Sequence, residues 1–242
     1  RKEEDCERLR GEGLESFPLD LEDGDSIAAG ADEALRRTGG TLDALFNNGA
    51  YAIPGRVEDL PTDALRAIFE ANFFGHHDLT RRIIPAMRAQ GHGRIVQNSS
   101  VLGFLALTYR AAYVSTKFAL EGYTDTLRRE MKGSGIHAIL IEPGPVTSRI
   151  RENARAHFEK WIDWKASPMR AAYEGALIPR LYDESGKKDR FELPASAVTA
   201  KLIHALEARK PHPRYFVTKP TYFANVMTRV LSTRLQDRLM GL

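Results

Sequence analysis

Tyr113 and Lys117 stand four residues apart and are suited together to acid–base chemistry. Residues 111–132 read as a helix, so the two side chains should share one face, one turn apart. A phenol has a pKa near ~10, and a neighbouring ammonium favours the phenolate and lowers that pKa. The pair could therefore serve as a general acid/base, although a core tyrosine beside a solvated lysine gives the same spacing.

Two further polar residues could join this pair. Ser100 lies thirteen residues before Tyr113, at the end of a predicted strand, where its hydroxyl could bond a substrate oxygen or simply close a turn. Asn72 falls inside a long predicted helix, although asparagine is a poor helix former and a buried amide needs partners. It would either serve the site or cap a kinked helix.

The elements that must position these residues alternate between helical and extended patterns, which predicts a parallel sheet covered by helices. Neither repeats nor low-complexity linkers interrupt the pattern, so we expect one domain over residues 1–242. The predicted helices cover residues 2–10, 23–37, 61–87, 111–132, 195–208 and 220 onward. The predicted strands cover residues 14–19, 42–46, 94–96, 136–141 and 215–217, and the apolar strand 136–141 should be buried on both faces.

Two regions of the last third have their own predicted uses. Residues 149–193 form an insertion with Trp161 and Trp164 after a strand end, where ligands bind in open α/β sheets, so we expect a substrate lid. Residues 220–242 have an apolar stripe and scattered arginines, which predicts an amphipathic helix. Packing on the domain or across a subunit interface is favoured, with a lid over a lipophilic substrate or a membrane-surface helix as alternatives.

The amino-acid composition excludes several classes of protein. The 242 residues carry 35 Lys+Arg, 32 Asp+Glu and 43% apolar residues, which is typical of a folded globular protein. Cys6 is the single cysteine and excludes a disulfide scaffold, and no apolar run reaches the ~20 residues that span a bilayer. We expect a cytoplasmic protein without a membrane segment. The basic end permits phosphate contacts, but no nucleic-acid motif and no metal-ligand grouping of histidines is present, so neither partner is predicted.

Taken together, these motifs resemble the short-chain dehydrogenase/reductase family. In order, the matching pieces are Asn47-Asn48-Gly49-Ala50, the helix with Asn72, Asn98-Ser99-Ser100-Val101-Leu102-Gly103, Tyr113-x-x-x-Lys117, and Pro143-Gly144-Pro145-Val146-Thr147-Ser148. The resemblance runs from residue 1 to about 148 and is looser beyond. It implies a Rossmann-like doubly wound parallel sheet in three α/β/α layers. It also implies hydride transfer between a nicotinamide cofactor and the alcohol or carbonyl carbon of a small molecule.

The resemblance assigns catalytic roles to four residues. Tyr113 would be the acid/base, and Ser100 would orient and polarise the carbonyl or alcohol. Lys117 would lower the pKa of Tyr113 and bind the nicotinamide ribose. Asn72 would hold a water that relays protons toward Lys117.

Cofactor contacts are implied in the same way, for three parts of the cofactor. Asp20 and Leu21 would contact the adenine, Asn47 and the backbone near Gly49 the adenosine ribose, and Pro143, Val146 and Ser148 the nicotinamide. Arg1 would meet the 2′-phosphate of NADP, so NADP is preferred to NAD, because the planar guanidinium pairs well with phosphate oxygens.

The sequence departs from the family pattern in two places. Gly49 and Ala50 stand in exchanged order, which permits a different local turn. The Gly-rich phosphate loop is absent, so we expect the first βαβ unit to be missing and the chain to begin part-way through a longer one. By analogy the protein should form a homodimer or homotetramer through the helices of residues 61–89 and 111–132. The alternative function is a catalytically silent protein that senses or binds nucleotide on the same fold.

Overall fold

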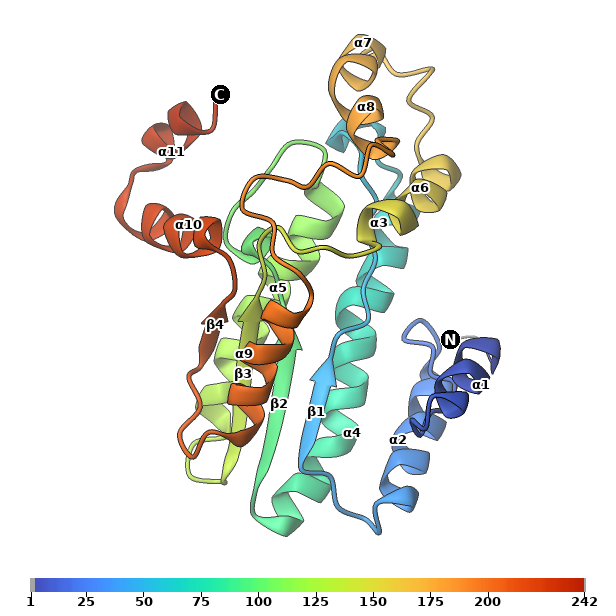
Figure 1. The fold of residues 1–242 in the computed structure, drawn as a ribbon, viewed down its shortest axis with the longest axis vertical. Helices are drawn as coiled ribbons and strands as arrows, with labels where there is room; N and C mark the ends of the chain where they lie inside the picture. The colour runs from blue at the N-terminus through green and yellow to red at the C-terminus, as the bar shows by residue number, and fades with distance from the viewer. Residues whose placement is uncertain (1–2, 242) are drawn as a thin grey trace.

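The computed structural model describes residues 3–241, and its centre is a four-stranded parallel sheet in the order β1-β2-β3-β4 (Figure 1). The strands are β1 (Ala44–Asn47), β2 (Gly93–Asn98), β3 (Ile136–Glu142) and β4 (Arg214–Phe216). Each strand pairs in parallel with the next along the chain. Parallel neighbours need a crossover, and helices supply each one here.

Helices cover both faces of the sheet. Ile95 of β2 packs against α2 (Gly24–Arg37), α4 (Gly75–Gln90) and α5 (Ala111–Glu130). Its neighbour Val96 points to the other face and packs against α9 (Ser196–Glu207). This alternation confirms the predicted three-layer α/β/α arrangement. The predicted apolar strand is also confirmed, since Ile139, Leu140 and Ile141 of β3 are at most 1% exposed.

The long helix predicted over residues 61–87 is interrupted. α3 (Thr62–Phe69) passes into the π-helical turn η2 (Glu70–Phe74) and then into α4. Asn72 lies in the π turn, where its amide bonds to backbone outside the helix. A π turn often marks a functional place in a helix.

The strand predicted at residues 14–19 is wrong. These residues have no regular secondary structure and form no ladder, and β1 is the edge strand of the described sheet. They join α1 (Glu3–Gly11) to α2, and Leu19 packs so closely on α2 that a Cβ at Gly30 would lie 2.7 Å from its Cδ1. A strand requires a hydrogen-bonded neighbour, which an apolar pattern alone does not supply.

The single helix predicted from residue 220 onward is two helices. α10 (Lys219–Val230) ends where Leu231 and Ser232 become extended, and α11 (Thr233–Leu239) follows. Both stand to one side of the sheet in Figure 1, beyond the β4 edge. No helix within residues 3–241 is long and apolar enough to cross a membrane.

The insertion at residues 149–193 is helical, as expected, and lies beyond the carboxyl ends of the strands (Figure 1). It contains four helical segments: α6 (Ile150–Trp161), α7 (Arg170–Ala172), the π turn η4 (Tyr173–Leu177) and α8 (Ile178–Leu181). Phe158 and Tyr173 of this insertion share a core with Ile53 and Ile68 of the body. The insertion is therefore packed onto the domain rather than hinged freely from it.

One carboxylate anchors the insertion. Asp59, at the end of η1 (Val57–Asp59), accepts hydrogen bonds from the Tyr173 hydroxyl at 2.7 Å and from Ser167 Oγ at 2.9 Å. The Tyr173 hydroxyl also accepts from the backbone N–H of Arg56 at 2.9 Å. Burial is the largest cause that raises the pKa of Tyr173, so this phenol remains neutral and donates to Asp59.

We expect Asp59→Ala to lower the free energy of unfolding by about 1–3 kcal/mol, because Tyr173 is fully buried and would lose its acceptor. Urea titration followed by circular dichroism measures the change. Asp63→Ala is the control, since Asp63 is exposed and bonds only exposed Arg66 in a helical i,i+3 pair. Equal effects of the two substitutions would contradict the anchoring role of Asp59.

Candidate active site

Ser100 and Tyr113 meet at the carboxyl end of β2. Ser100 follows the strand by two residues and caps the short 3-10 helix η3 (Val101–Gly103) by accepting from Leu102 N at 3.1 Å. Tyr113 is the third residue of α5 and its side chain is half-buried. Burial raises the pKa of Tyr113 to about 12, and a hydrogen bond from the Ser100 hydroxyl opposes that rise. Ser100 Oγ also donates to Pro143 O at 3.5 Å, so the structure brings Ser100 close both to Tyr113 and to the segment after β3.

Lys117 lies one turn beyond Tyr113 and is only 1% exposed. Its Nζ donates to the carbonyl oxygen of Asn98 at 2.7 Å and lies 5.4 Å from the centre of the Tyr113 ring. Burial lowers the pKa of Lys117 to about 8, and the charge of Glu121 works against that fall. An ammonium has three N–H donors, so two remain beyond the one that Asn98 accepts.

The sequence predicts that Lys117 lowers the pKa of Tyr113, and this is not the net result in the structure. Burial dominates the raised pKa of Tyr113, and the opposing group is Ser100. The physical reason is desolvation, which penalises a phenolate more than a partly screened neighbouring charge stabilises it. The juxtaposition of Tyr113, Lys117 and Ser100 is nevertheless the one that the sequence predicts.

Asn72 forms hydrogen bonds to two segments next to the helix that contains it. Its Oδ1 accepts from Tyr51 N at 3.0 Å, and its Nδ2 donates to Tyr51 O at 2.9 Å. Nδ2 also lies 3.4 Å from Thr116 Oγ1, one residue before Lys117. Asn72 thus joins the interrupted helix to the loop after β1 and to α5, which agrees with the structural interpretation that the sequence left open.

Behind Lys117 lies a buried ionic cluster that the sequence analysis missed. Glu121 accepts from Ser99 Oγ and from Arg214, and Arg214 also bonds Glu142 and, at 2.8 Å, Asp125. One signal was available, because Glu121 stands four residues after Lys117 on the same helix. Nothing local points to Arg214, since only the pairing of β3 with β4 brings it to the cluster.

Glu142 makes stability depend on pH. Its side chain is fully buried, Oε1 accepts from Arg214, and Oε2 has no partner within residues 3–241. Burial first, and the charge of Glu121 second, raise the pKa of Glu142 above its ordinary value. The folded protein therefore keeps a proton that the unfolded chain loses near pH ~4.3. Stability from this group is complete below that pH and is lost as pH rises through the raised pKa.

We accordingly expect Glu142→Gln to flatten the fall in the free energy of unfolding between pH 5 and pH 8. Urea unfolding at three pH values across that window measures the slope. Glu152→Gln is the control, because Glu152 is exposed and pairs with exposed Arg149. An unchanged slope in Glu142→Gln would show that Glu142 does not carry the dependence.

The residues expected near the adenosine lie at the edge of the body beside β1. Leu21 packs so close to Gly49 that a Cβ there would lie 2.8 Å from Leu21 Cδ1, which gives the exchanged Gly49-Ala50 order a packing reason. Asp20 Oδ1 accepts from Glu22 N at 3.0 Å. The Asn47 side chain is buried and donates to Thr80 Oγ1 at 2.9 Å. Arg1 lies outside the described residues.

The residues expected near the nicotinamide follow β3. Pro143 O accepts from Val101 N at 2.8 Å, which ties this segment to the loop of Ser100. Gly144 permits a close approach to the β4 side, since a Cβ there would lie 2.2 Å from Thr218 Oγ1. Val146 pairs with Leu193 of the insertion, and Ser148 is exposed. Pro143, Val146 and Ser148 thus lie along one segment that begins beside Ser100.

The residues present at this end of the sheet fit a nicotinamide ribose. The buried Lys117 ammonium keeps two donors for ribose hydroxyls, and the Tyr113 hydroxyl is half-buried beside it. The sequence contains no Gly-x-x-x-Gly-x-Gly run that could hold a pyrophosphate. Within residues 3–241 no group of three or more His, Cys, Asp or Glu could hold a metal ion.

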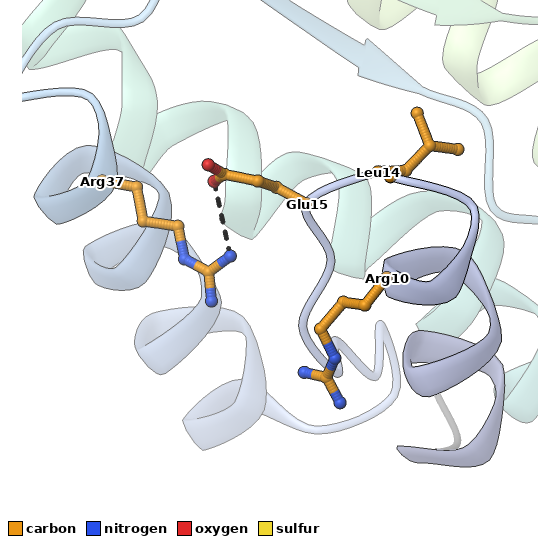
Figure 2. A pocket seen from close by; sticks show the side chains of 5 residues that line it. Arg10, Leu14, Glu15 and Arg37 are labelled. Atoms are coloured by element: carbon orange, nitrogen blue, oxygen red, sulfur yellow. Dashed lines mark hydrogen bonds and ion pairs between the residues drawn. The ribbon is translucent and has the colours of Figure 1, made fainter.

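A surface hollow lies elsewhere, between the end of α1 and the end of α2. Figure 2 shows Arg10, Leu14, Glu15 and Arg37 around it, with Arg37 and Glu15 forming an ion pair at 3.5 Å. None of its lining residues belongs to the Tyr113 group. Arg10, which also lines it, pairs instead with Glu3, so the hollow contains no group of the candidate active site.

A parallel α/β sheet with a tyrosine, a lysine and a serine gathered at its carboxyl edge defines a class of nucleotide-dependent oxidoreductases. The family model described as short chain dehydrogenase matches residues 2–159. The chain belongs to this family, and is an NAD(P)-dependent oxidoreductase that acts on small molecules.

Similar proteins support this placement. The uncharacterized oxidoreductase YbbO of Escherichia coli (strain K12) is 36% identical over 240 residues, which cover 99% of this chain and 82% of that protein. The NADPH-dependent 3-dehydrocapnine reductase of Ornithobacterium rhinotracheale is 28% identical over 82% of this chain and 69% of its own length.

Solved structures share the fold. A short-chain dehydrogenase from Streptomyces avermitilis superposes with a TM-score of 0.77 at 24% identity, covering 100% of this chain and 84% of that one. A short chain dehydrogenase/reductase from Burkholderia phymatum in complex with NAD gives a TM-score of 0.72 at 24% identity, covering 98% of this chain and 80% of that one.

Proposed function

We propose that this protein interconverts an alcohol and a carbonyl, with Tyr113 as the acid/base. The observation that carries the proposal is that the buried Lys117 ammonium lies 5.4 Å from the centre of the Tyr113 ring at the carboxyl end of the sheet, with Ser100 close enough to lower the pKa of Tyr113. Ligands of open α/β sheets bind at this end. Membership of the family indicates the general class of reaction, and this arrangement supports the proposed choice of catalytic residues.

Each residue has a separate task in the direction of reduction. The Ser100 hydroxyl donates to the substrate carbonyl oxygen and holds it next to Tyr113. The Tyr113 hydroxyl gives its proton to that oxygen as negative charge develops there. The hydride to the carbonyl carbon would come from a nicotinamide held beside Lys117 and Tyr113. In oxidation the proton returns from the alcohol to Tyr113.

Lys117 makes this proton transfer feasible near neutral pH. Its pKa of about 8 keeps it mostly charged at pH 7, and its two remaining N–H donors are available to the ribose. With water excluded, its charge counts for more beside a forming phenolate. We assign Asn72 the task of holding a water next to Lys117 through the second lone pair of Oδ1, because its Nδ2 donors already bond Tyr51 O and Thr116 Oγ1.

The preferred cofactor in this proposal is NADP. Support comes from the NADPH-dependent reductase among the relatives, while the structural neighbour with NAD shows that the fold also accepts the other dinucleotide. We place Asp20, Leu21, Asn47 and Gly49 on the adenosine side. Pro143, Val146 and Ser148 lie on the nicotinamide side.

We further propose a homodimer or homotetramer, with residues 149–193 as a lid within one domain of residues 1–242. Phe74 and Phe118, at the start of α4 and within α5, are exposed apolar side chains that an oligomer would cover. Sedimentation analysis reads the assembly state directly. The cytoplasmic location stays a prediction from the sequence.

Fluorescence titration tests the function in two steps. NADPH and NADH are titrated against the protein, and a panel of aldehydes and ketones is then screened for oxidation of the bound cofactor. We expect tighter binding of NADPH and turnover of at least one carbonyl. Binding without turnover across the panel would favour the alternative, a silent nucleotide-binding protein.

A further inference from the structure

A half-buried arginine near the reaction centre lacks an acceptor. Arg110 makes no side-chain hydrogen bond, ion pair or ring contact within residues 3–241. The other described arginines without such a contact lie exposed on the surface, where water serves them. Arg110 is less exposed than these, and its guanidinium donors have no acceptor among the described residues, so a ligand oxygen could replace the water that reaches them.

The charged groups acting most strongly on Arg110 are cations. Burial first, then the charges of Arg180 and Arg151, lower the pKa of Arg110. Arg151 and Arg180 converge on one carboxylate, Asp189, at 3.0 Å and 2.5 Å. Asp189 does not bond Arg110. Arg151 of α6 and Arg180 of α8 thus add positive potential at Arg110, and the carboxylate that they share does not pair with it.

Backbone contacts fix the position of Arg110 at the start of α5. Arg110 is the N-cap residue of α5, so its backbone lies within one turn of Tyr113 at the start of that helix. The preceding residue, Tyr109, has φ 63°, a left-handed conformation that is unusual outside glycine. It is fixed because Tyr109 O accepts from Gly55 N at 3.0 Å and Tyr109 Oη donates to Ala172 O at 3.0 Å. Such strain persists where the surroundings enforce it, and it collects at binding sites.

We propose that Arg110 binds an oxyanion carried by the substrate, a carboxylate, sulfonate or phosphate, with Arg151 and Arg180 adding positive potential from the lid. This inference rests on the proposed function and names its substrate class: carbonyl compounds or alcohols with an acidic group within reach of Tyr113. The planar guanidinium offers two parallel donors to such a group. The anion thereby fixes the orientation of the carbonyl toward Ser100 and Tyr113.

A matched pair of substrates tests the proposal. 4-Formylbenzoate carries a carboxylate, and its methyl ester is a neutral aldehyde of nearly the same shape. We compare kcat/KM for the two with NADPH at constant ionic strength, in the wild type, Arg110→Gln and Arg110→Lys. 4-Formylbenzenesulfonate and 4-formylphenyl phosphate identify which oxyanion is preferred. Arg129→Gln is the control, because Arg129 is exposed at the far end of the same helix.

We expect the wild type to favour the carboxylate over the ester by about tenfold to a hundredfold, the range that one charged hydrogen-bonded contact gives. In Arg110→Gln the ratio should fall to about one, Arg110→Lys should keep part of it, and Arg129→Gln should keep all of it. A wild type that favours the ester overturns the proposal. Equal losses for both substrates in Arg110→Gln also overturn it, because they indicate a merely structural role.

A binding measurement separates this inference from the proposed function. Benzoate, which cannot be reduced by the enzyme, is titrated by calorimetry into the wild type and Arg110→Gln in the presence of NADP. Benzoate binding that requires Arg110, without turnover of any aldehyde, would retain the anion site and reject the oxidoreductase role. Aldehyde turnover with no Arg110-dependent benzoate binding and no preference for the acid would do the reverse.

Discussion

Tyr113→Phe should lower kcat by about a hundredfold to ten-thousandfold, the usual contribution of a positioned acid/base. The substitution removes one oxygen and leaves the ring, which is half-buried in the first turn of α5. NADPH binding should persist, because Lys117 keeps its bond to the Asn98 carbonyl. Steady-state kinetics with a reducible aldehyde, together with NADPH fluorescence, give both quantities.

Tyr123→Phe is the matched control for this experiment. Tyr123 lies on the same helix and its hydroxyl bonds only to the exposed His77 at 3.2 Å. Its loss should change kcat by less than about twofold, since no proton of the reaction passes near it. If Tyr113→Phe retained the wild-type rate, Tyr113 could not be the acid/base.

Arg214→Met should lower the free energy of unfolding by about 3–5 kcal/mol, because it leaves the carboxylates of Glu121 and Asp125 without their shared cation and the buried Glu142 carboxyl without its donor. Arg214 bonds Glu121, Glu142 and Asp125, and Glu142 is fully buried. Urea unfolding at pH 7 measures the loss. Arg128→Met is the control, since Arg128 pairs with Asp125 alone at a partly exposed site and should cost no more than about 1 kcal/mol.

Removing the acids as well distinguishes charge from packing. In Arg214→Met combined with Glu121→Gln and Glu142→Gln, no buried charge is left unpaired at those two positions, so a large part of the lost stability should return. The same loss in the single and the combined variant would show that Arg214 stabilises through its packed stem rather than its charge.

Local patterns predicted the elements that are determined locally. Residues 111–132 and 136–141 fall within two residues of the observed α5 and β3, because a helical period and an unbroken apolar run leave few alternatives. The prediction of a strand at residues 14–19 failed because strand formation depends on a neighbouring strand elsewhere in the chain. The sequence did not predict the π turn at Asn72, because this turn depends on hydrogen bonds to the distant backbone of Tyr51.

The same division applies to the candidate site. The sequence identified Tyr113 and Lys117 by their spacing on one predicted helix, and Ser100 by its position after a predicted strand. Arg110 stands only three residues before Tyr113, but its lack of a protein acceptor is a property of the folded surroundings. Arg214 and Glu142 are 72 residues apart and become neighbours only through the sheet.

The shared carboxylate of Glu121 has an evolutionary consequence. Through Ser99 and Arg214 it connects the strand end beside the reaction centre to the far edge strand, and its charge also acts on Lys117. We therefore expect a substitution that displaces Glu121 to change both the stability of the β4 edge and the pKa of Lys117. Evolutionary change at that edge would then act on folding and on the acid–base group together.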